Sequence, residues 1–220
     1  GPVAGTQVAD WPISYEDLAP HYDEVERTIG VQGDVTRMPA RSLAQAPRSG
    51  QFPMLPNPTG YAARLLAAGA INVGWEPFPY PAAVNSRPYD GRPACNSCGL
   101  CSSFGCPINA RGDALVSYLN PALLTGRVRL IERALAYRIQ TNAAGDRATA
   151  VHYYDADGRS QRLSADKILI AGSPIQTARL LLLSANGAHP NGLGNGSDQL
   201  GRNLMFHYFT QGGAEFERDV

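Results

Sequence analysis

The stretch Lys167-Ile-Leu-Ile-Ala-Gly-Ser-Pro-Ile-Gln-Thr-Ala-Arg-Leu-Leu-Leu-Leu-Ser184 decides the fold class of this chain. Residues 167–171 are nearly all apolar, which predicts a strand buried in a parallel sheet. Gly172 and Ser173 break the strand, and residues 174–184 are predicted to form an apolar helix. The first turn of such a helix offers free N–H groups and a positive dipole to an anion such as a pyrophosphate. An ordinary strand–helix junction without a ligand is the alternative.

Three strands are predicted before this stretch, at residues 134–141, 148–154 and 160–165, and Asp157-Gly158 marks a hairpin turn between the last two. A further short strand is predicted at residues 128–131. A three-stranded excursion directly before a strand–helix unit is typical of flavoproteins with two dinucleotide-binding domains. The sequence therefore predicts an α/β fold, mixed with α+β, that carries a β-meander insertion.

The first half of the chain has a different texture, made of helix and loop. Ser14 followed by Asp17 predicts the start of a helix that ends at Gly30. Pro20 is expected at the first position of a following helix, where its missing N–H costs nothing. The remaining expectations are a helix at 61–70, loops without elements at 31–58 and 76–94, and helical pieces at 113–118 and 121–124 separated by Asn120-Pro121.

Composition and charge exclude several classes of protein. The 19 Lys and Arg residues balance 19 Asp and Glu, so electrostatic binding of nucleic acid is not the main function. A hydrophobic content of 44% excludes an intrinsically disordered chain. No apolar run approaches the ~18 residues of a transmembrane helix, and the N-terminal region lacks the pattern of a signal peptide. Cytoplasm and periplasm both stay open as the compartment.

All four cysteines fall in one stretch, at Cys95, Cys98, Cys101 and Cys106, with the spacing C-x2-C-x2-C-x4-C and a proline after the last. Thiolates at such spacing can ligate an iron–sulfur cluster, although the bacterial ferredoxin run is one residue shorter in its last interval. Zinc also accepts four thiolates, but its sites usually split into two distant pairs. Disulfides in an oxidising compartment, or free thiols in a loop near the active site, are the other interpretations.

Gly192, Gly194 and Gly196 follow a helix and not a strand, so they predict a turn and not a dinucleotide-binding loop. Asn195-Gly196-Ser197 is formally a glycosylation sequon, which the lack of a secretion signal discounts. His207 is a candidate general base, but a structural histidine at the start of a strand is the favoured interpretation.

Four segments, in this order, resemble the bacterial dehydrogenase branch of the glucose–methanol–choline (GMC) family of FAD-dependent oxidoreductases. Residues 11–22, WPISYEDLAPHY, are similar to the family's W-P-[IL]-x-Y-x-D-L-x-P-Y-Y, and residues 105–111, GCPINAR, to its G-C-P-x-x-A-[KR]. Residues 167–184 and 200–207 resemble two further family segments, around the A-G and the G-R-N-L-M-x-H patterns. Gln176-Thr177 stands where the family's G-S-x-x-S-P signature has Ser-Pro, which favours the dehydrogenases over the oxidases.

The resemblance implies an FAD-dependent enzyme that oxidises the CH–OH group of an alcohol or a sugar by hydride transfer to flavin N5. Its electron acceptor would be a quinone, a cytochrome or oxygen. The resemblance places Ala171, Gly172 and Ser173 near the FAD and Ala136 on the adenine side, in contact through its backbone. It places Asn109 and Ala110 along the flavin ring.

The resemblance also implies a division of the chain. Residues 1–105 are expected to form the cap and lid, residues 106–203 part of the FAD-binding domain, and residues 204–220 the start of an antiparallel substrate sheet. Family enzymes carry G-x-G-x-x-G near the N-terminus and a catalytic histidine near the C-terminus, and this sequence contains neither. The chain is therefore expected to be a central piece that supplies no catalytic residue and is inactive alone.

Two other classes of function stay open from the residues themselves. An iron–sulfur or metal-binding electron-transfer module would use the four cysteines, and a non-catalytic interaction domain would use the long loops as binding surface. A flavin absorbance spectrum would favour the oxidoreductase, whereas stoichiometric iron and acid-labile sulfide would favour the electron-transfer module.

Overall fold

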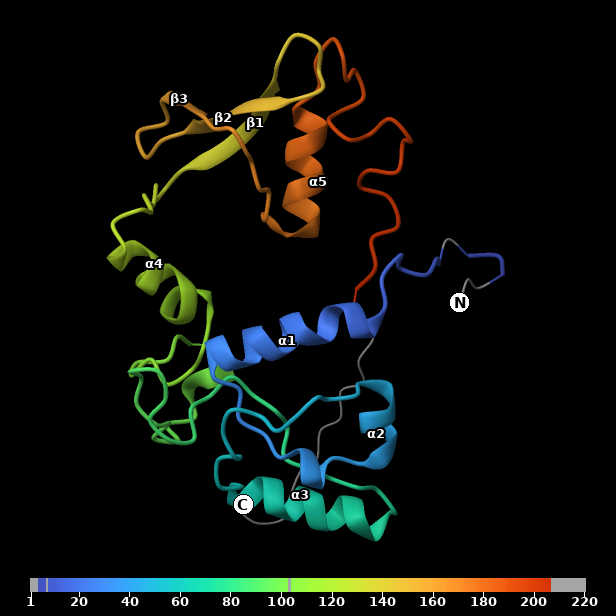
Figure 1. Cartoon of the computed structure of the whole chain (residues 1–220), viewed down its shortest axis with the longest axis vertical. Coiled ribbons are helices and arrows are strands. Elements are labelled where there is room, and N and C mark those ends of the chain that lie inside the picture. Colours follow the sequence, from blue (N-terminus) through green and yellow to red (C-terminus); the bar gives the residue numbers. More distant parts are fainter. Residues whose placement is uncertain (1–3, 7, 103, 207–220) are drawn as a thin grey trace, which may run out of the picture. The chain divides into compact units, whose positions relative to one another are not determined.

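The computed structural model describes residues 4–6, 8–102 and 104–206. The described chain divides into two units: residues 8–129 form the body of the first, and residues 130–206 belong to the second (Figure 1). Helices and a three-stranded antiparallel sheet confirm the mixed α/β class. The division follows Arg129, and the functional boundary expected at residue 106 stays a prediction. No helix in the described ranges is long and apolar enough to cross a membrane.

Helix α1 (Tyr15–Ile29) begins and ends where the sequence predicts. The Ser14 hydroxyl accepts a hydrogen bond from the Asp17 N–H at 3.2 Å, and the Asp17 carboxylate accepts one from the Ser14 N–H at 2.8 Å. This reciprocal pair is a capping box, which satisfies two N–H groups at the start of the helix. At the other end, Gly30 takes a left-handed conformation with φ of 76°.

The expectation for Pro20 is wrong, because this residue lies inside α1 and not at the start of a second helix. A proline removes one hydrogen bond from a helix interior and disfavours the preceding turn. Here the capping box has already fixed the first turn at Ser14, so the helix continues through Pro20 up to Ile29. The preference of proline for the first turn of a helix therefore gave the wrong prediction here, because the cap at Ser14 and the stop at Gly30 define the two ends of the helix.

The expectation that residues 31–58 hold no element is also wrong. They contain the 3-10 turn η1 (Val35–Arg37) and the short helix α2 (Ala40–Gln45). Asp34 starts η1 by accepting the N–H of Thr36 at 3.0 Å. A helix as short as α2 cannot display a hydrophobic period, which is why the sequence did not reveal it. Helix α3 (Tyr61–Asn72) confirms the prediction at 61–70.

Much of the core of the first unit is built from loops. Gln32 exchanges backbone hydrogen bonds with Ala82 in both directions, at 2.8 and 3.1 Å, and the Gly33 N–H donates to Met54 at 2.9 Å. Val31, Phe52 and Met54 are buried around these contacts. Backbone hydrogen bonds therefore join segments that lie far apart in the sequence, and no local sequence pattern predicts these bonds.

Residues 114–124 form one continuous helical stretch, which corrects the prediction of two pieces separated at Asn120-Pro121. A π turn, η3 (Leu115–Leu119), runs directly into α4 (Asn120–Leu124). Pro121 is the second residue of α4 and therefore lies inside this continuous stretch, directly after the π turn. One further 3-10 turn, η2 (Leu100–Ser102), lies within the cysteine stretch.

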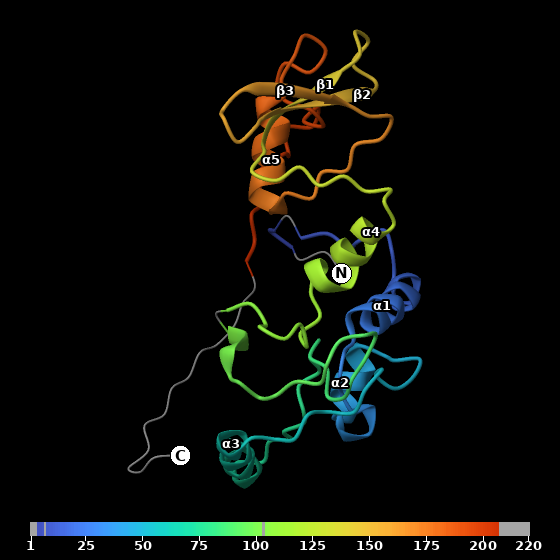
Figure 2. The ribbon, with the colours of Figure 1, turned by 90° about the vertical axis from the view of Figure 1, so that its left-hand side faces the viewer.

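The second unit contains the predicted β-meander, with β1 (Leu135–Thr141), β2 (Ala148–Tyr154) and β3 (Ser160–Ser164) antiparallel and in chain order (Figure 2). Helix α5 (Ser173–Leu183) packs against β1. Ser184, which is 0% exposed, joins the two: its hydroxyl accepts from the Ile139 N–H at 2.8 Å and donates to the Leu180 carbonyl at 2.6 Å. The helix is therefore fixed to the sheet by a hydrogen bond as well as by apolar contact.

Two predicted strands are absent from this structure, at residues 128–131 and 167–171. A strand exists only when a neighbour accepts its hydrogen bonds, and no described segment pairs with either stretch. Leu169 is 92% exposed, against the expectation that it is buried in a parallel sheet. The apolar composition of residues 167–171 favours burial, but composition alone does not provide a neighbouring strand to pair with.

The segment after α5 is a series of turns held by Asn195. This side chain is only 6% exposed. Its amide nitrogen donates to the Asn191 carbonyl at 2.8 Å, and its oxygen accepts from the Leu200 N–H at 3.0 Å. The predicted turn at 192–196 is confirmed, and Asn195 is the residue that stabilises it.

Candidate cofactor site

The start of α5 has the properties that the sequence predicts for an anion site. Gly172 is the residue before the helix, no side chain of a described residue caps the first turn, and Pro174 lies within that turn. Ala171, Gly172 and Ser173 are all exposed. The free N–H groups of a helix start carry a partial positive charge, so an exposed and uncapped start can hold a phosphate.

Gly172 is not required by the fold around it. Its φ is −89°, an ordinary value for any residue. A Cβ placed there would meet nothing nearer than Gln176 and Thr177, at 3.7 Å. The missing side chain therefore leaves open space beside the helix start, as a closely approaching ligand requires. Ser173 has the rare positive φ of 74°, the kind of backbone strain that gathers at ligand sites.

Ala136 lies in β1, half-buried and paired with Tyr153, next to an irregularity in the pairing between Ala136 and Arg138. It belongs to the same unit as the turn at 171–173. The predicted contact of its backbone with the adenine side of FAD stays a prediction.

Asn109 and Ala110 lie in the first unit, on a loop tied to residues 83–85. The Ala110 carbonyl accepts the Asn85 N–H at 2.9 Å, and the Gly112 N–H donates to the Ala83 carbonyl at 2.8 Å. Ala110 is 1% exposed, whereas Asn109 is exposed and takes a φ of 58°. The predicted cofactor residues thus fall into both units, and the part of Asn109 and Ala110 at the flavin ring remains a prediction.

The cysteine stretch gives no support to a metal centre. Cys95, Cys98, Cys101 and Cys106 are all free thiols. Among the residues that the structure describes, no three His, Cys, Asp or Glu side chains come together as metal ligands. Burial raises the pKa of the Cys106 thiol, but hydrogen bonds from the backbone N–H groups of residues 108–111 lower this pKa by a larger amount. The pKa of Cys106 therefore lies below its usual value.

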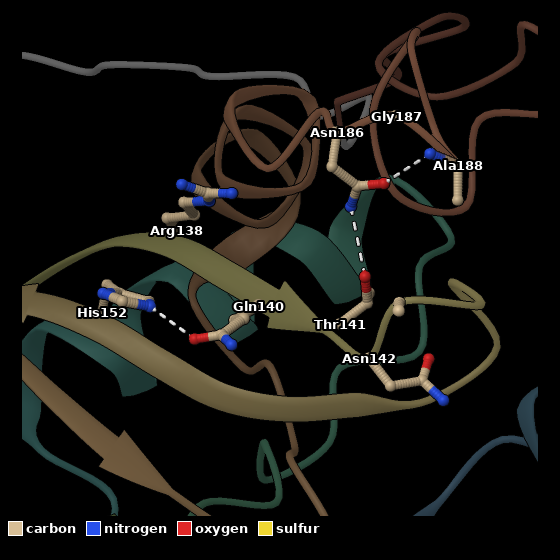
Figure 3. A pocket seen from close by; sticks show the side chains of 9 residues that line it. Arg138, Gln140, Thr141, Asn142, His152, Asn186, Gly187 and Ala188 are labelled. Carbon is tan, nitrogen blue, oxygen red and sulfur yellow. Dashed lines mark hydrogen bonds between the residues drawn. The ribbon is translucent and has the colours of Figure 1, made fainter.

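One cavity was missed by sequence reasoning (Figure 3). It has a volume of about 460 Å³ and lies in the second unit. Polar side chains of β1 and β2 and the turn after α5 line it, among them Arg138, Gln140, Thr141, His152 and Asn186. The only local signal was the alternation of polar residues at 138 and 140, which by itself indicates a solvated strand face.

Comparison with known proteins decides the family. The family model described as GMC oxidoreductase matches residues 56–209. The chain belongs to the GMC oxidoreductase family. In this GMC chain the matched region includes every residue predicted to contact the cofactor, from Asn109 to Ser173.

Curated relatives of the GMC chain come from several bacteria. It is 38% identical to the fructose dehydrogenase large subunit of Gluconobacter japonicus over 198 residues, which are 90% of this chain and 35% of that protein. It is 36% identical to 6'''-hydroxyparomomycin C oxidase of Streptomyces lividus, over 88% of this chain and 34% of that protein. It is 30% identical to the gluconate 2-dehydrogenase flavoprotein of Pantoea cypripedii, over 98% of this chain and 37% of that protein. The chain thus spans about a third of the length of these relatives.

The structure does not describe residues 207–220. The candidate base His207 and most of the expected start of the substrate sheet, residues 204–220, therefore lie outside the described residues.

Proposed function

We propose that this chain is part of an FAD-dependent oxidoreductase that oxidises the CH–OH group of an alcohol or a sugar. The observation that carries the proposal is the exposed, uncapped start of α5 behind Gly172, in a chain that belongs to the GMC oxidoreductases. Free N–H groups and open space beside a glycine fit the pyrophosphate of a dinucleotide. The finer fold proposed for the second unit is part of a two-dinucleotide-binding-domain flavoprotein.

The proposed roles of this chain's residues follow from their positions. The N–H groups of the first turn of α5 hold the negative charge of the pyrophosphate, and Gly172 lets it approach. The backbone of Ala136 contacts the adenine side, and Asn109 and Ala110 border the flavin ring. When bound, FAD supplies an acceptor for the hydride at N5. The base that takes the hydroxyl proton is not among the residues assigned to this chain.

The substrate class is supported by the relatives, whose names include a fructose dehydrogenase, a gluconate 2-dehydrogenase flavoprotein and a 2-methyl-1,2-propanediol dehydrogenase. All three substrates carry CH–OH groups. We extend the same class, a sugar, a sugar acid or an aliphatic alcohol, to the protein that contains this chain. Its electron acceptor, whether quinone, cytochrome or oxygen, is part of the proposal.

The test uses the whole protein that contains this chain, as its gene encodes it. Purified protein is expected to carry FAD, seen as visible flavin absorbance. That absorbance should bleach without oxygen when fructose, gluconate or 2-methyl-1,2-propanediol is added. Absence of bound flavin, or a flavin that no CH–OH compound reduces, would overturn the proposal.

Residues 1–220 alone provide a second measurement. Supplied with FAD, an alcohol or sugar and an artificial electron acceptor, this chain is expected to give no turnover, since the proposal assigns it no base. Clear dye reduction by the chain alone would contradict that assignment.

A further inference from the structure

The cavity at β1 and β2 is distinct from the candidate cofactor site, and most of its unpaired side-chain groups are hydrogen-bond donors. Several of the side chains that line it are hydrogen-bonded to one another, as the dashed lines in Figure 3 show. Which hydrogen-bonding groups remain free is therefore fixed by the structure.

The oxygen acceptors of the lining are already used. Gln140 Oε1 accepts from Arg162 Nε at 3.0 Å and is 2.9 Å from His152 Nε2. Because an arginine can only donate, this atom is the oxygen, and the histidine must then donate to it. Asn186 Oδ1 accepts the backbone N–H groups of Ala188 and His189, at 2.9 and 3.1 Å.

Two further acceptors are used in the same way. Asn142 Oδ1 accepts the Arg147 N–H at 3.3 Å, while its amide nitrogen donates to Asp146 at 2.7 Å. Thr141 Oγ1 accepts from Asn186 Nδ2 at 3.3 Å. Each amide orientation is set by a partner that can act in only one sense.

Most of the groups left over are donors. Gln140 Nε2 and the hydroxyl hydrogen of Thr141 have no acceptor among the described residues, and the Arg138 guanidinium has no hydrogen bond or ion pair to another described residue. The exception is His152 Nδ1, which is an acceptor when the imidazole is neutral and its Nε2 donates to Gln140. Among the described residues, no carboxylate and no aromatic ring besides the His152 imidazole lines the cavity. A cation would lack a counter-charge there, and a nucleobase or a sugar ring would lack a large ring face on which to stack.

We propose that this cavity binds a small oxyanion, either a phosphate or a carboxylate. Arg138 supplies the charge and a planar pair of donors, which match the geometry of both anions. Gln140 Nε2 and the Thr141 hydroxyl supply neutral donors beside it. This site is independent of the proposed oxidoreductase function, since no residue assigned to FAD lines it.

The experiment titrates the 220-residue chain with inorganic phosphate and, separately, with acetate, and follows amide signals by NMR. Saturable shifts are expected at the Gln140 side-chain amide and at the backbone of residues 186–188. The tighter of the two anions identifies which oxyanion chemistry the site prefers. If neither anion produces saturable shifts at these amides, the proposal is overturned.

Three variants make the test specific. Arg138→Gln should weaken binding by about tenfold or more, because a charge-assisted bidentate contact is lost. Gln140→Glu keeps an oxygen for His152 and Arg162 but replaces the free donor with a second oxygen, so binding should be abolished while the sheet stays folded. Arg179→Gln, an exposed arginine of α5 outside the cavity, is the matched control and should bind normally. Equal weakening in Arg138→Gln and Arg179→Gln would indicate diffuse attraction and would overturn the site.

Discussion

Gly112 and Gly172 lack a side chain for opposite reasons. A Cβ on Gly112 would lie 1.8 Å from the Ile29 carbonyl oxygen, so the fold of the first unit has no space for one. A Cβ on Gly172 would meet nothing within 3.7 Å, so the fold of the second unit does not require glycine there. Packing explains the first glycine, and for the second we propose that it leaves space for the cofactor to approach.

Gly112→Ala is expected to destabilise the protein by about 3 kcal/mol or more, because a backbone carbonyl cannot move away as a flexible side chain can. Chemical denaturation measures the change. Gly69→Ala, in the interior of α3 with nothing within 4 Å, is the control and should stabilise by about 0.5–1 kcal/mol. A Gly112→Ala protein as stable as the parent would show that α1 and the 109–112 loop are not in this contact.

Gly172→Ala is expected to leave the stability within about 0.5 kcal/mol of the parent and to weaken FAD binding. The reason is that its methyl group fills the space beside the start of α5 without disturbing the protein's own atoms. Bound flavin after dialysis, measured on the protein as its source encodes it, tests this expectation. Full retention of flavin in Gly172→Ala would remove Gly172 from the cofactor site.

At the scale of single elements, the capping box makes α1 sensitive to acid. Hydrogen bonds from the backbone and side chain of Ser14 lower the pKa of Asp17. A lowered pKa in the folded state means that Asp17 stabilises the protein above its unfolded pKa, and that this contribution is lost as pH falls through the folded value. Asp17→Asn should therefore cost stability at neutral pH and progressively less on acidification.

Denaturation of the parent and of Asp17→Asn across the acidic range measures this difference. Glu76→Gln removes an exposed carboxylate that makes no hydrogen bond to another described residue, and it should show no such convergence. A gap between parent and Asp17→Asn that stays constant down to strong acid would rule out the proposed role of the cap.

The hydroxyl of Ser184 joins the end of α5 to strand β1. Ser184→Ala leaves the buried N–H of Ile139 without an acceptor, which is expected to cost about 1–3 kcal/mol. Ser164→Ala, at the exposed end of β3, should change stability by less than about 0.5 kcal/mol. Equal stabilities of the two variants would mean that the bond to Ile139 contributes nothing.

Elements with their own signals were predictable, and elements that need a distant partner were not. Helix α1 has a cap and a stop, and the meander has alternation and a hairpin turn, so both follow from local sequence. Residues 167–171 have the composition of a buried strand but no pairing neighbour in the described chain. The cavity was beyond prediction for a related reason, because its free donors are defined by bonds between β1, β2 and the turn after α5.

At the scale of the whole molecule, each unit has buried residues of its own, such as Met54 in the first and Ile139 in the second. Gly112→Ala is therefore expected to shift the unfolding transition followed by the amide signal of Met54, whereas Ser184→Ala should leave that transition in place and shift the one followed by the amide signal of Ile139. If Ser184→Ala moves both transitions equally, the two units unfold as one.

The family could be inferred from four motifs, because each motif is contained in a short window of sequence, whereas the cofactor residues taken from these motifs stay a prediction. The division after Arg129 could not be inferred, since it reflects which segments share a core. The metal interpretation receives no support, since the close spacing of Cys95, Cys98, Cys101 and Cys106 along the chain does not bring three thiols together among the described residues.

The enclosed amide of Asn195 has a consequence for the choice of expression host. Asn195-Gly196-Ser197 is an acceptor sequence for N-linked glycans, and a secretory pathway attaches the glycan to a chain before it has folded. The nitrogen that would carry the sugar is the one that donates to the Asn191 carbonyl inside a closed turn. Because Asn195 is only 6% exposed, a glycan on this nitrogen would disfavour the turn that follows α5, so a host that does not glycosylate should give the higher yield of folded protein.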